Sequence, residues 1–309
     1  MWMREPGEVV DRLHFLGTHD NCLYLLRGEE AMIIGGGMSW IAPSLEEQLS
    51  MMDFDPDRLK YLVILHSHFD HCGAVPYLKR KFPRIQVIAS AHAAKVLARE
   101  KVVSFIATAN KQMIDRLGLQ DEYERLNLSF DGIQVDRIVA EKDIIDLGDG
   151  IEVNFLETPG HTKCSVAAYV PKLKALFPSD AAPPPTEDEN AVFYPGPQYD
   201  FSMYEESLKK LASCEVEICA FEHYGVVTDD QARKILRQGL NQTEAFKNRI
   251  VELYRETGGL DETVQRVGAE TVKGSKFEFI DAELQTTILQ AVVRNALRDA
   301  RLLDEAPAL

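Results

Sequence analysis

Three histidines and one aspartate fall within six consecutive positions in the stretch HSHFDHCG, residues 66–73. The chain has only 8 histidines among 309 residues, and these three follow directly after the uncharged segment YLVIL at 61–65. Imidazole and carboxylate groups together are typical ligands of zinc, iron and manganese. His66 and His68 are two positions apart, so both side chains can point to the same side where the strand ends. The stretch therefore predicts a metal site at the end of a buried strand.

Three more candidate ligands also follow segments that resemble strands. His161 follows a strand and a Pro-Gly turn in LETPGHTKCS, Asp180 ends the segment ALFPSD, and His223 ends EICAFEH. The alternative is a set of polar loops whose histidines only form hydrogen bonds. Five of the eight histidines lie at strand ends, where a rigid scaffold meets a site-forming loop. Scattered structural histidines would not be expected to gather there, so the metal site is favoured.

The composition describes an acidic chain with enough apolar residues for a large core. Lys and Arg total 34 against 49 Asp and Glu, which gives a net charge of −15, and 45% of the residues are hydrophobic. So acidic a surface disfavours nucleic acid or an anionic membrane as a partner. No apolar run is long enough to cross a bilayer. We therefore expect a small-molecule substrate, no nucleic-acid partner and no membrane partner.

The cysteines and the first residues indicate a cytoplasmic protein. The five cysteines are odd in number and none are spaced as CxxC, which favours reduced thiols over a disulfide framework. The opening MWMREPGEVVD lacks the apolar region of a signal peptide. Cys72 and Cys164 lie near candidate ligands, and we expect both to be small buried side chains.

Short strand-like and helical segments alternate over most of the chain. Strands are predicted in DRLHFLG, NCLYLLRG and AMIIGGG, followed by a helix in SLEEQLSMM with Ser44 as its N-cap. Residues 91–126 predict an inserted helical hairpin. Helical spacing dominates the end of the chain, where Asp281 is the expected N-cap of a last helix. These patterns predict two packed sheets with helices outside in residues 1–228, and a helical C-terminal extension in residues 229–309.

The order of the motifs, HxHxDH, a lone histidine after Pro-Gly, an aspartate after an apolar strand and a late histidine, resembles the metallo-β-lactamase superfamily. The resemblance covers about residues 10–228 and implies an αββα sandwich of the α/β class with a dinuclear metal site at one edge. It implies that one metal is bound by His66, His68 and His161, a second by Asp70, His71 and His223, and both by Asp180. This set is similar to that of the branch with glyoxalase II, lactonases and thioesterase-like proteins.

Two positions depart from the pattern of that superfamily. Its members usually end an early strand with an aspartate in an IDTG-like turn, where this chain has IIGGGM. Gly35 to Gly37 give the backbone freedom but supply no carboxylate, which leaves open what supports the ligands at this turn. The glycine that usually follows shortly after the lone histidine is replaced by Cys164.

A dinuclear site of this kind implies hydrolysis. Two divalent metals, zinc first and iron or manganese as alternatives, would share a water molecule at a separation of about 3.5–4 Å. Their charge would make a bridging hydroxide available near neutral pH. Asp70 would bind metal and also orient that hydroxide. Tyr194 and Tyr224 are candidates to donate a hydrogen bond to the developing oxyanion, although either ring could simply be packed.

An ester, thioester or lactone with an apolar acyl group is the substrate class that the sequence favours. It has no cluster of arginine and lysine of the kind that would grip glutathione or a nucleic-acid backbone. Apolar residues such as Phe246, Phe277, Phe279 and Leu284 could line a pocket, and we expect part of the C-terminal extension to cover the site.

Two other functions and a homodimer stay open. One function is an iron-dependent redox enzyme on the same fold, although the flavodiiron branch of the superfamily has an acidic residue where this chain has His68. The other is a regulatory protein with a residual hydrolase site. A homodimer would place the apolar stripes of the C-terminal helices against a second subunit.

Overall fold

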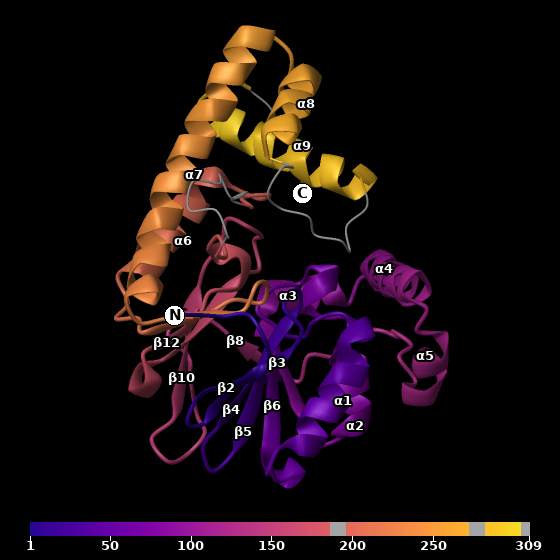
Figure 1. The fold of residues 1–309 in the computed structure, drawn as a ribbon. Helices are drawn as coiled ribbons and strands as arrows, with labels where there is room; N and C mark the ends of the chain where they lie inside the picture. The colour runs from indigo at the N-terminus through magenta and orange to yellow at the C-terminus, as the bar shows by residue number, and fades with distance from the viewer. Residues whose placement is uncertain (186–195, 272–281, 304–309) are drawn as a thin grey trace.

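The computed structural model describes residues 1–185, 196–271 and 282–303 (Figure 1). Four residues named above, Tyr194, Phe277, Phe279 and Asp281, lie outside the described residues. The described chain folds into two sheets that pack face to face, with helices on both outer faces. This arrangement confirms the αββα sandwich and the α/β class.

Each of the two sheets has seven strands within the described residues. The first sheet has the order β2 (Gly7–Val10), β3 (Leu13–Gly17), β4 (Cys22–Arg27), β5 (Ala31–Ile34), β6 (Leu59–Val63), β7 (Gln86–Ser90) and β8 (Arg137–Val139). The second has the order β1 (Trp2–Met3), β14 (Val226–Thr228), β13 (Ile218–Ala220), β12 (Ala175–Phe177), β11 (Val166–Val170), β10 (Glu152–Glu157) and β9 (Ile144–Asp146). Both sheets are mixed, because β5 to β8 run parallel in the first and β12 and β13 run parallel in the second.

Helices from separate parts of the sequence cover the two sheets. The first sheet is covered by α1 (Ala42–Met51), α2 (Val75–Lys81), α3 (Ala91–Leu97), α4 (Glu100–Leu117) and α5 (Gln120–Leu126). The second sheet is covered by α6 (Phe201–Ala212) and the first turns of α7 (Asp229–Thr257). Two further helices, α8 (Leu260–Thr271) and α9 (Ala282–Asp299), stand with most of α7 beyond the end of the sandwich (Figure 1).

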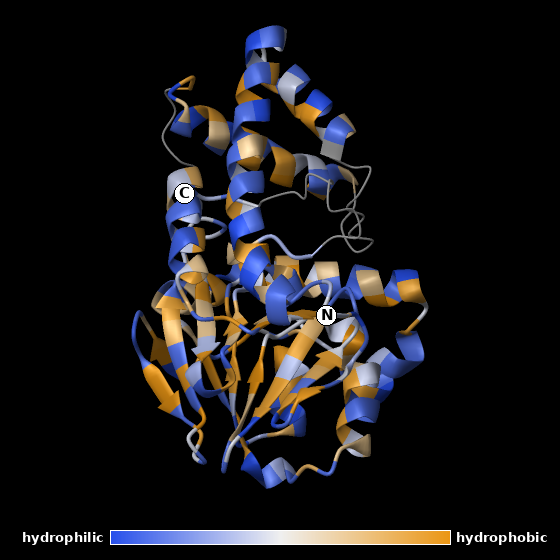
Figure 2. Ribbon diagram, turned by 60° about the vertical axis from the view of Figure 1, so that its left-hand side comes forward, coloured by the Kyte–Doolittle hydropathy of each residue, from blue (hydrophilic) through white to orange (hydrophobic). Residues whose placement is uncertain are grey.

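Strand β4 shows why this sequence forms a central strand. Tyr24 and Leu26 belong to the core between the two sheets, whereas Leu23 and Leu25 belong to the core between the first sheet and its helices. Successive side chains of a strand point to opposite faces. Both faces of β4 are covered, so the segment is apolar without alternation. Figure 2 shows the strands mostly in hydrophobic colours, whereas the helices carry hydrophilic residues on one side.

The C-terminal helices have a hydrophobic core of their own. Phe246, Ile250 and Leu253 recur at helical spacing along α7 and pack with apolar residues of α8 and α9. Phe201, the first residue of α6, belongs to the same cluster. The helical unit is therefore anchored by a residue that precedes the proposed division at 228/229, and that division stays a prediction.

Two local expectations are corrected by the structure, and several short strands are added to those expected. Helix α1 begins at Ala42 rather than after Ser44, with no side-chain cap and with a proline in its first turn, a position that suits proline because its missing N–H has no helical partner there. The segment 91–126 forms three helices rather than a hairpin. Strands β1, β2, β8 and β14 are two to four residues long, too short to show a period in the sequence.

Within the described residues, no helix is both long and apolar enough to span a membrane.

Candidate metal centre

The predicted ligands gather at one edge of the sandwich because the strands that precede them end there. In the second sheet, β10 and β12 are both antiparallel to β11, and β13 is parallel to β12, so all three run in one direction. Their ends are followed by His161, Asp180 and His223. In the first sheet, β6 leads to His66 and His68, and the short 3-10 helix Phe69–His71 follows. All seven candidate ligands thus come from loops at the ends of four strands.

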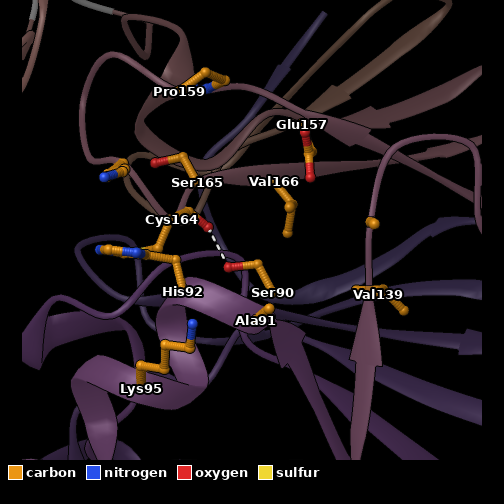
Figure 3. Close-up of a pocket in the computed structure, with 12 residues that line it drawn as sticks. Ser90, Ala91, His92, Lys95, Val139, Glu157, Pro159, Cys164, Ser165 and Val166 are labelled. Carbon is orange, nitrogen blue, oxygen red and sulfur yellow. Dashed lines mark hydrogen bonds between the residues drawn. The ribbon is translucent and has the colours of Figure 1, made fainter.

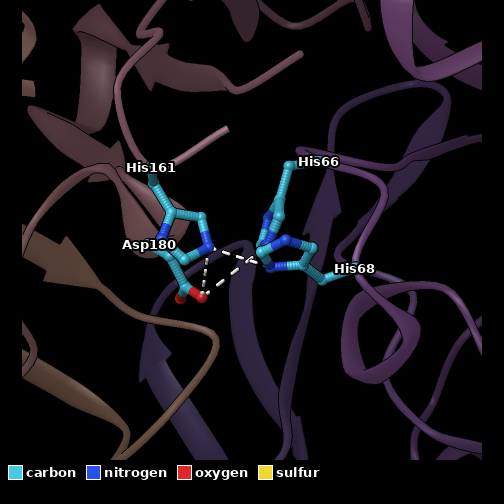
Figure 4. A group of neighbouring side chains, drawn as sticks. All are labelled: His66, His68, His161 and Asp180. Carbon is cyan, nitrogen blue, oxygen red and sulfur yellow. Dashed lines mark hydrogen bonds and ion pairs between the residues drawn. The ribbon is translucent and has the colours of Figure 1, made fainter. Parts of the chain in front are cut away.

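One group of candidate ligands consists of His66, His68, His161 and Asp180, whose ligand atoms lie within 4.8 Å of one another. Figure 4 shows His66 and His68 facing His161 and Asp180 across the interface of the sheets. His161 Nε2 lies 3.0 Å from His68 Nδ1 and 3.3 Å from Asp180 Oδ2. Two ligands of a tetrahedral zinc ion stand about 3.4 Å apart, so these separations suit a shared ion.

A second group consists of Asp70, His71 and His223. Asp70 Oδ2 lies 3.5 Å from the Nε2 atoms of both His71 and His223. Asp180 belongs to this group as well, because its Oδ2 lies 3.3 Å from His71 Nε2 and its Oδ1 lies 4.0 Å from His223 Nε2. Asp180 therefore contacts both groups, which is the position that a bridging ligand requires.

Four of the histidines turn their Nε2 atoms to the cluster because an oxygen atom faces Nδ1. Nδ1 is hydrogen-bonded to Gly196 O in His161, to Asp20 O at 2.6 Å in His223 and to Ser179 Oγ at 3.0 Å in His66. In His71, Nδ1 faces Glu222 Oε2 at 3.0 Å as an ion pair without hydrogen-bond geometry. A neutral imidazole that donates from Nδ1 has a lone pair on Nε2. Each ring is thus set to bind a cation through Nε2, as in the histidines of known metal sites.

The ionisable groups of the site would be stabilised by a positive charge at its centre. Burial raises the pKa values of the Asp70 and Asp180 carboxyls, but His71 and the other nearby histidines hold both well below the usual range. Burial lowers the pKa of His71, but Asp70, Glu222 and Asp180 raise it well above its usual value. Burial lowers the pKa of His68 to about 3. Nε2 of His66 is buried without a hydrogen-bond partner, so the donor set fits a metal ion.

A cavity of about 570 Å³ opens onto the ligands. Its floor includes five of them, and apolar side chains of α8 and α9, among them Val264, Leu284, Ile288 and Leu289, form much of its wall. Leu284 also packs against the core of the first sheet and its helices. Phe246, another expected lining residue, lies instead in the core of the C-terminal helices. The cavity is therefore shared between the sandwich and the helical region.

The tyrosines at the site differ from those expected. Tyr224 is not among the residues that line the cavity, and its ring packs edge-on against His19, so its catalytic role stays a prediction, as does that of Tyr194. Tyr204 of α6, which the sequence did not single out, lines the cavity. It is 1% exposed and its hydroxyl makes no hydrogen bond within the described residues. Burial, with the nearby Asp180, raises the pKa of the Tyr204 phenol, and the backbone N–H of Gly196, which is near the hydroxyl without hydrogen-bond geometry, lowers it to a smaller extent.

Glu222 is a second residue that the sequence analysis missed. It is 3% exposed and lies next to His71 and Ser179. A glutamate in the apolar segment EICAFEH was the available signal, because a buried carboxylate is rare unless it is paired. Cys72 and Cys164 are buried free thiols, as expected, and neither belongs to a ligand group among the described residues.

A smaller pocket of about 280 Å³ is lined by the loop after β10, with Pro159 and Cys164, and by the end of β7 and the start of α3 (Figure 3). Ser90, at the end of β7, donates a hydrogen bond of 2.7 Å to the carbonyl oxygen of Cys164, which ties this loop to the first sheet. His92, Lys95 and Lys163 also line this pocket. Residues of the same loop thus line both pockets, but its ligand His161 lines only the larger one.

Comparison with known proteins shows the family of this chain. The model of the metallo-beta-lactamase superfamily matches residues 17–223, which include all seven candidate ligands, so the chain belongs to this superfamily. Members of the superfamily bind divalent metals and are mostly metal-dependent hydrolases.

The individual relatives are more distant. A metallo-beta-lactamase fold-containing protein of Sulfurisphaera tokodaii is 27% identical over 226 residues, which are 72% of this chain and 79% of that protein. A putative diflavin flavoprotein of Nostoc sp. is 25% identical over 58% of this chain but only 26% of its own length. Among solved structures, a metallo-beta-lactamase family protein of Thermus thermophilus has a TM-score of 0.66 at 16% identity, covering 95% of both chains. That likeness shows the fold alone.

Proposed function

We propose that this protein is a dinuclear metal-dependent hydrolase of an ester, thioester or lactone with an apolar acyl group. One observation carries the proposal: seven histidine and aspartate side chains converge in one cluster, and five of them line a cavity with a largely apolar wall. A regulatory protein with a residual site would have no need to keep His66, His161 and His223 oriented by hydrogen bonds to Nδ1.

The residues divide into two sets around the bridging position of Asp180. His66, His68 and His161 would hold one ion, and Asp70, His71 and His223 the other. Divalent ions there, zinc first and iron or manganese as alternatives, would polarise the scissile carbonyl and lower the pKa of a water molecule. Asp70 lines the cavity, so its carboxylate could also orient the attacking oxygen.

Tyr204 is the best-placed group to stabilise the oxyanion that forms when the carbonyl is attacked. Its hydroxyl is buried, unpartnered within the described residues and set in the wall of the cavity near Asp180. A buried hydroxyl without a partner costs stability, and a substrate oxygen would supply the missing partner. A hydrogen-bond donor that contacts the oxygen as its negative charge develops stabilises the transition state more than the bound substrate, and so accelerates the reaction.

The shape and lining of the cavity support the choice of an apolar acyl group. Leu284, Ile288 and Leu289 of α9 and Val264 of α8 meet any substrate that reaches the ligands. About 25 cal/mol is gained for each Å² of apolar surface removed from water, so an acyl chain against this wall would be bound and water would be excluded. Part of the C-terminal extension would in this way act as the cover of the site.

An iron-dependent redox enzyme is the second candidate, and the match to a putative diflavin flavoprotein keeps it open. His68 counts against it, since the flavodiiron branch has an acidic residue there. The test is to load metal-free protein with zinc, iron or manganese and to screen p-nitrophenyl esters, acyl-CoAs, lactones and phosphodiesters. Hydrolysis of a carbonyl ester by the zinc form supports the proposal. Oxygen consumption that requires iron, with no hydrolysis by any metal form, contradicts it.

A further inference from the structure

We infer that Glu222 is a positioning residue that sets the ring orientation and tautomer of one histidine in each half of the metal centre. This inference builds on the proposed function. The carboxylate takes a place that the turn IIGGGM leaves without an acidic group. It comes from the loop after β13, in the second sheet, and reaches the ligands of the first sheet.

The contacts of Glu222 run to both halves of the site. Its Oε2 lies 3.0 Å from Nδ1 of His71 and accepts a short hydrogen bond from the hydroxyl of Ser179. Ser179 Oγ in turn lies 3.0 Å from Nδ1 of His66. The Ser179 hydroxyl donates its proton to Glu222, so the Ser179 oxygen must accept a hydrogen bond from Nδ1 of His66. At His66 this hydrogen-bond chain keeps the proton on Nδ1 and the lone pair on Nε2. At His71 the contact is an ion pair without hydrogen-bond geometry, and the nearby carboxylate favours a proton on the Nδ1 that faces it.

The glycine at the end of β5 makes room for this carboxylate. A Cβ atom at Gly35 would lie 2.9 Å from Glu222 Oε1, closer than a non-bonded contact allows, and the φ of Gly35 is +93°. An aspartate at position 35 would therefore require the Glu222 carboxylate to shift. The missing carboxylate in the turn and the presence of Glu222 are therefore linked, because the glycine leaves the space that the glutamate occupies. The backbone of Glu222 is held in place as well, since the backbone N–H of Cys22 donates to its carbonyl oxygen at 2.8 Å.

Charge balance also favours a role with metal bound. Oε1 of Glu222 is buried without a hydrogen-bond partner, and an isolated buried carboxylate is unfavourable unless cations are close. Asp70 and Asp180 supply two negative charges to the site. Two divalent ions would bring four positive charges, so two carboxylate ligands leave an excess of positive charge. The buried carboxylate of Glu222 offsets part of that excess.

The test compares zinc affinity among four proteins, with metal-free samples titrated in competition with a chromophoric chelator. Glu222→Gln keeps the shape of the side chain and removes its charge, and we expect about 10- to 100-fold weaker zinc binding at both sites. Ser179→Ala removes only the link to His66, so one of the two zinc equivalents should weaken. Glu217→Gln, an exposed glutamate on the same segment that pairs with Lys174, is the matched control and should bind as the wild type does.

A structural role alone would lower the melting temperature without changing the rings. Long-range ¹H–¹⁵N NMR spectra of the metal-free proteins should therefore report an Nδ1–H tautomer for His66 in the wild type and mixed tautomers in Glu222→Gln, because bound zinc would itself fix the tautomer. Unchanged affinity and unchanged tautomers in a folded Glu222→Gln would overturn the inference. If that variant does not fold, an unchanged Ser179→Ala overturns it instead. Neither readout needs a substrate, so a protein that fails to hydrolyse the panel leaves this result standing and counts only against the proposed function.

Discussion

The Nε2 atoms of His71 and His223 lie 3.1 Å apart, although each ring directs its other nitrogen at an oxygen atom. With Nδ1 protonated in both rings, the two Nε2 lone pairs meet unless a cation or an extra proton stands between them. The carboxylates around His71 raise its pKa against the effect of burial, so a proton supplies that charge when metal is absent. The pair is therefore arranged for a cation, which is the basis of the predictions that follow.

Asp180→Asn should leave a folded protein that holds less metal. The carboxylate contacts histidines of both ligand groups, and a neutral amide neither bridges two cations well nor balances their charge. We expect fewer than two zinc ions per chain by elemental analysis, lost hydrolysis, and an unchanged far-UV circular dichroism spectrum. Asp121→Asn on the exposed side of α5 is the control. Full turnover of Asp180→Asn with two metals retained would refute the bridging role.

Gly35→Ala should destabilise the fold more than an alanine at another left-handed glycine. At Gly35 the new methyl group meets Glu222 at 2.9 Å, whereas Gly118, with φ of +67°, has nothing within 4 Å. Gly118→Ala therefore bears only the backbone cost, about 1 kcal/mol in the free energy of unfolding. For Gly35→Ala we expect about 2–3 kcal/mol and weaker zinc binding, measured by urea unfolding and chelator competition. Equal costs at the two glycines would show that the Glu222 contact does not matter.

Tyr204→Phe and Tyr24→Phe remove the same hydroxyl from two buried rings and should act in opposite ways. The Tyr24 hydroxyl donates to the carbonyl oxygen of Phe221, so its loss should lower the free energy of unfolding by about 1–2 kcal/mol. The Tyr204 hydroxyl has no such partner among the described residues, so its removal should leave stability unchanged or raise it.

The kinetic effect of the same pair should be reversed. If Tyr204 donates to the oxyanion, Tyr204→Phe should lower kcat by about 10²-fold with zinc content intact, and Tyr24→Phe should change kcat little. A Tyr204→Phe variant that is destabilised and fully active would contradict the assignment.

Leu284→Trp should change the preference among acyl chain lengths, because Leu284 lines the cavity beside the ligands. A larger side chain fills space that a long acyl group would occupy, so kcat/KM should fall more for long chains than for short ones. Glu283→Trp places the same ring on an exposed neighbouring position of α9 and is the control. Unaltered kinetics of Leu284→Trp together with a changed oligomer mass would make the extension an interface instead of a cover.

The sequence predicts those parts of the structure that depend on a local pattern of residues. Tyr24 and its apolar neighbours predict a central strand because both faces of β4 are buried, and HxHxDH predicts ligands because two histidines follow the end of β6. Ser44 was wrongly placed as a cap, since α1 starts earlier with proline in its first turn.

The roles of the residues next to the ligands become clear only in the folded structure, although the glutamate in the apolar segment EICAFEH was a signal in the sequence. Glu222 and Gly35 are far apart in the sequence and belong to different sheets, so only their contact explains why one carries a carboxylate and the other no side chain. Tyr204 reads as one more aromatic residue of an amphipathic helix, and its hydroxyl, unpartnered within the described residues, becomes visible only when α6 is packed beside the cavity.

The central claim is tested most directly by adding zinc to the metal-free protein while following hydrolysis of a panel of acyl esters, thioesters and lactones. We predict that hydrolysis rises with zinc, reaches its plateau at two equivalents per chain and disappears when a chelator removes the metal. Hydrolysis that persists without metal, or a protein that binds two zinc ions and cleaves no member of the panel, would contradict the assignment as a dinuclear hydrolase.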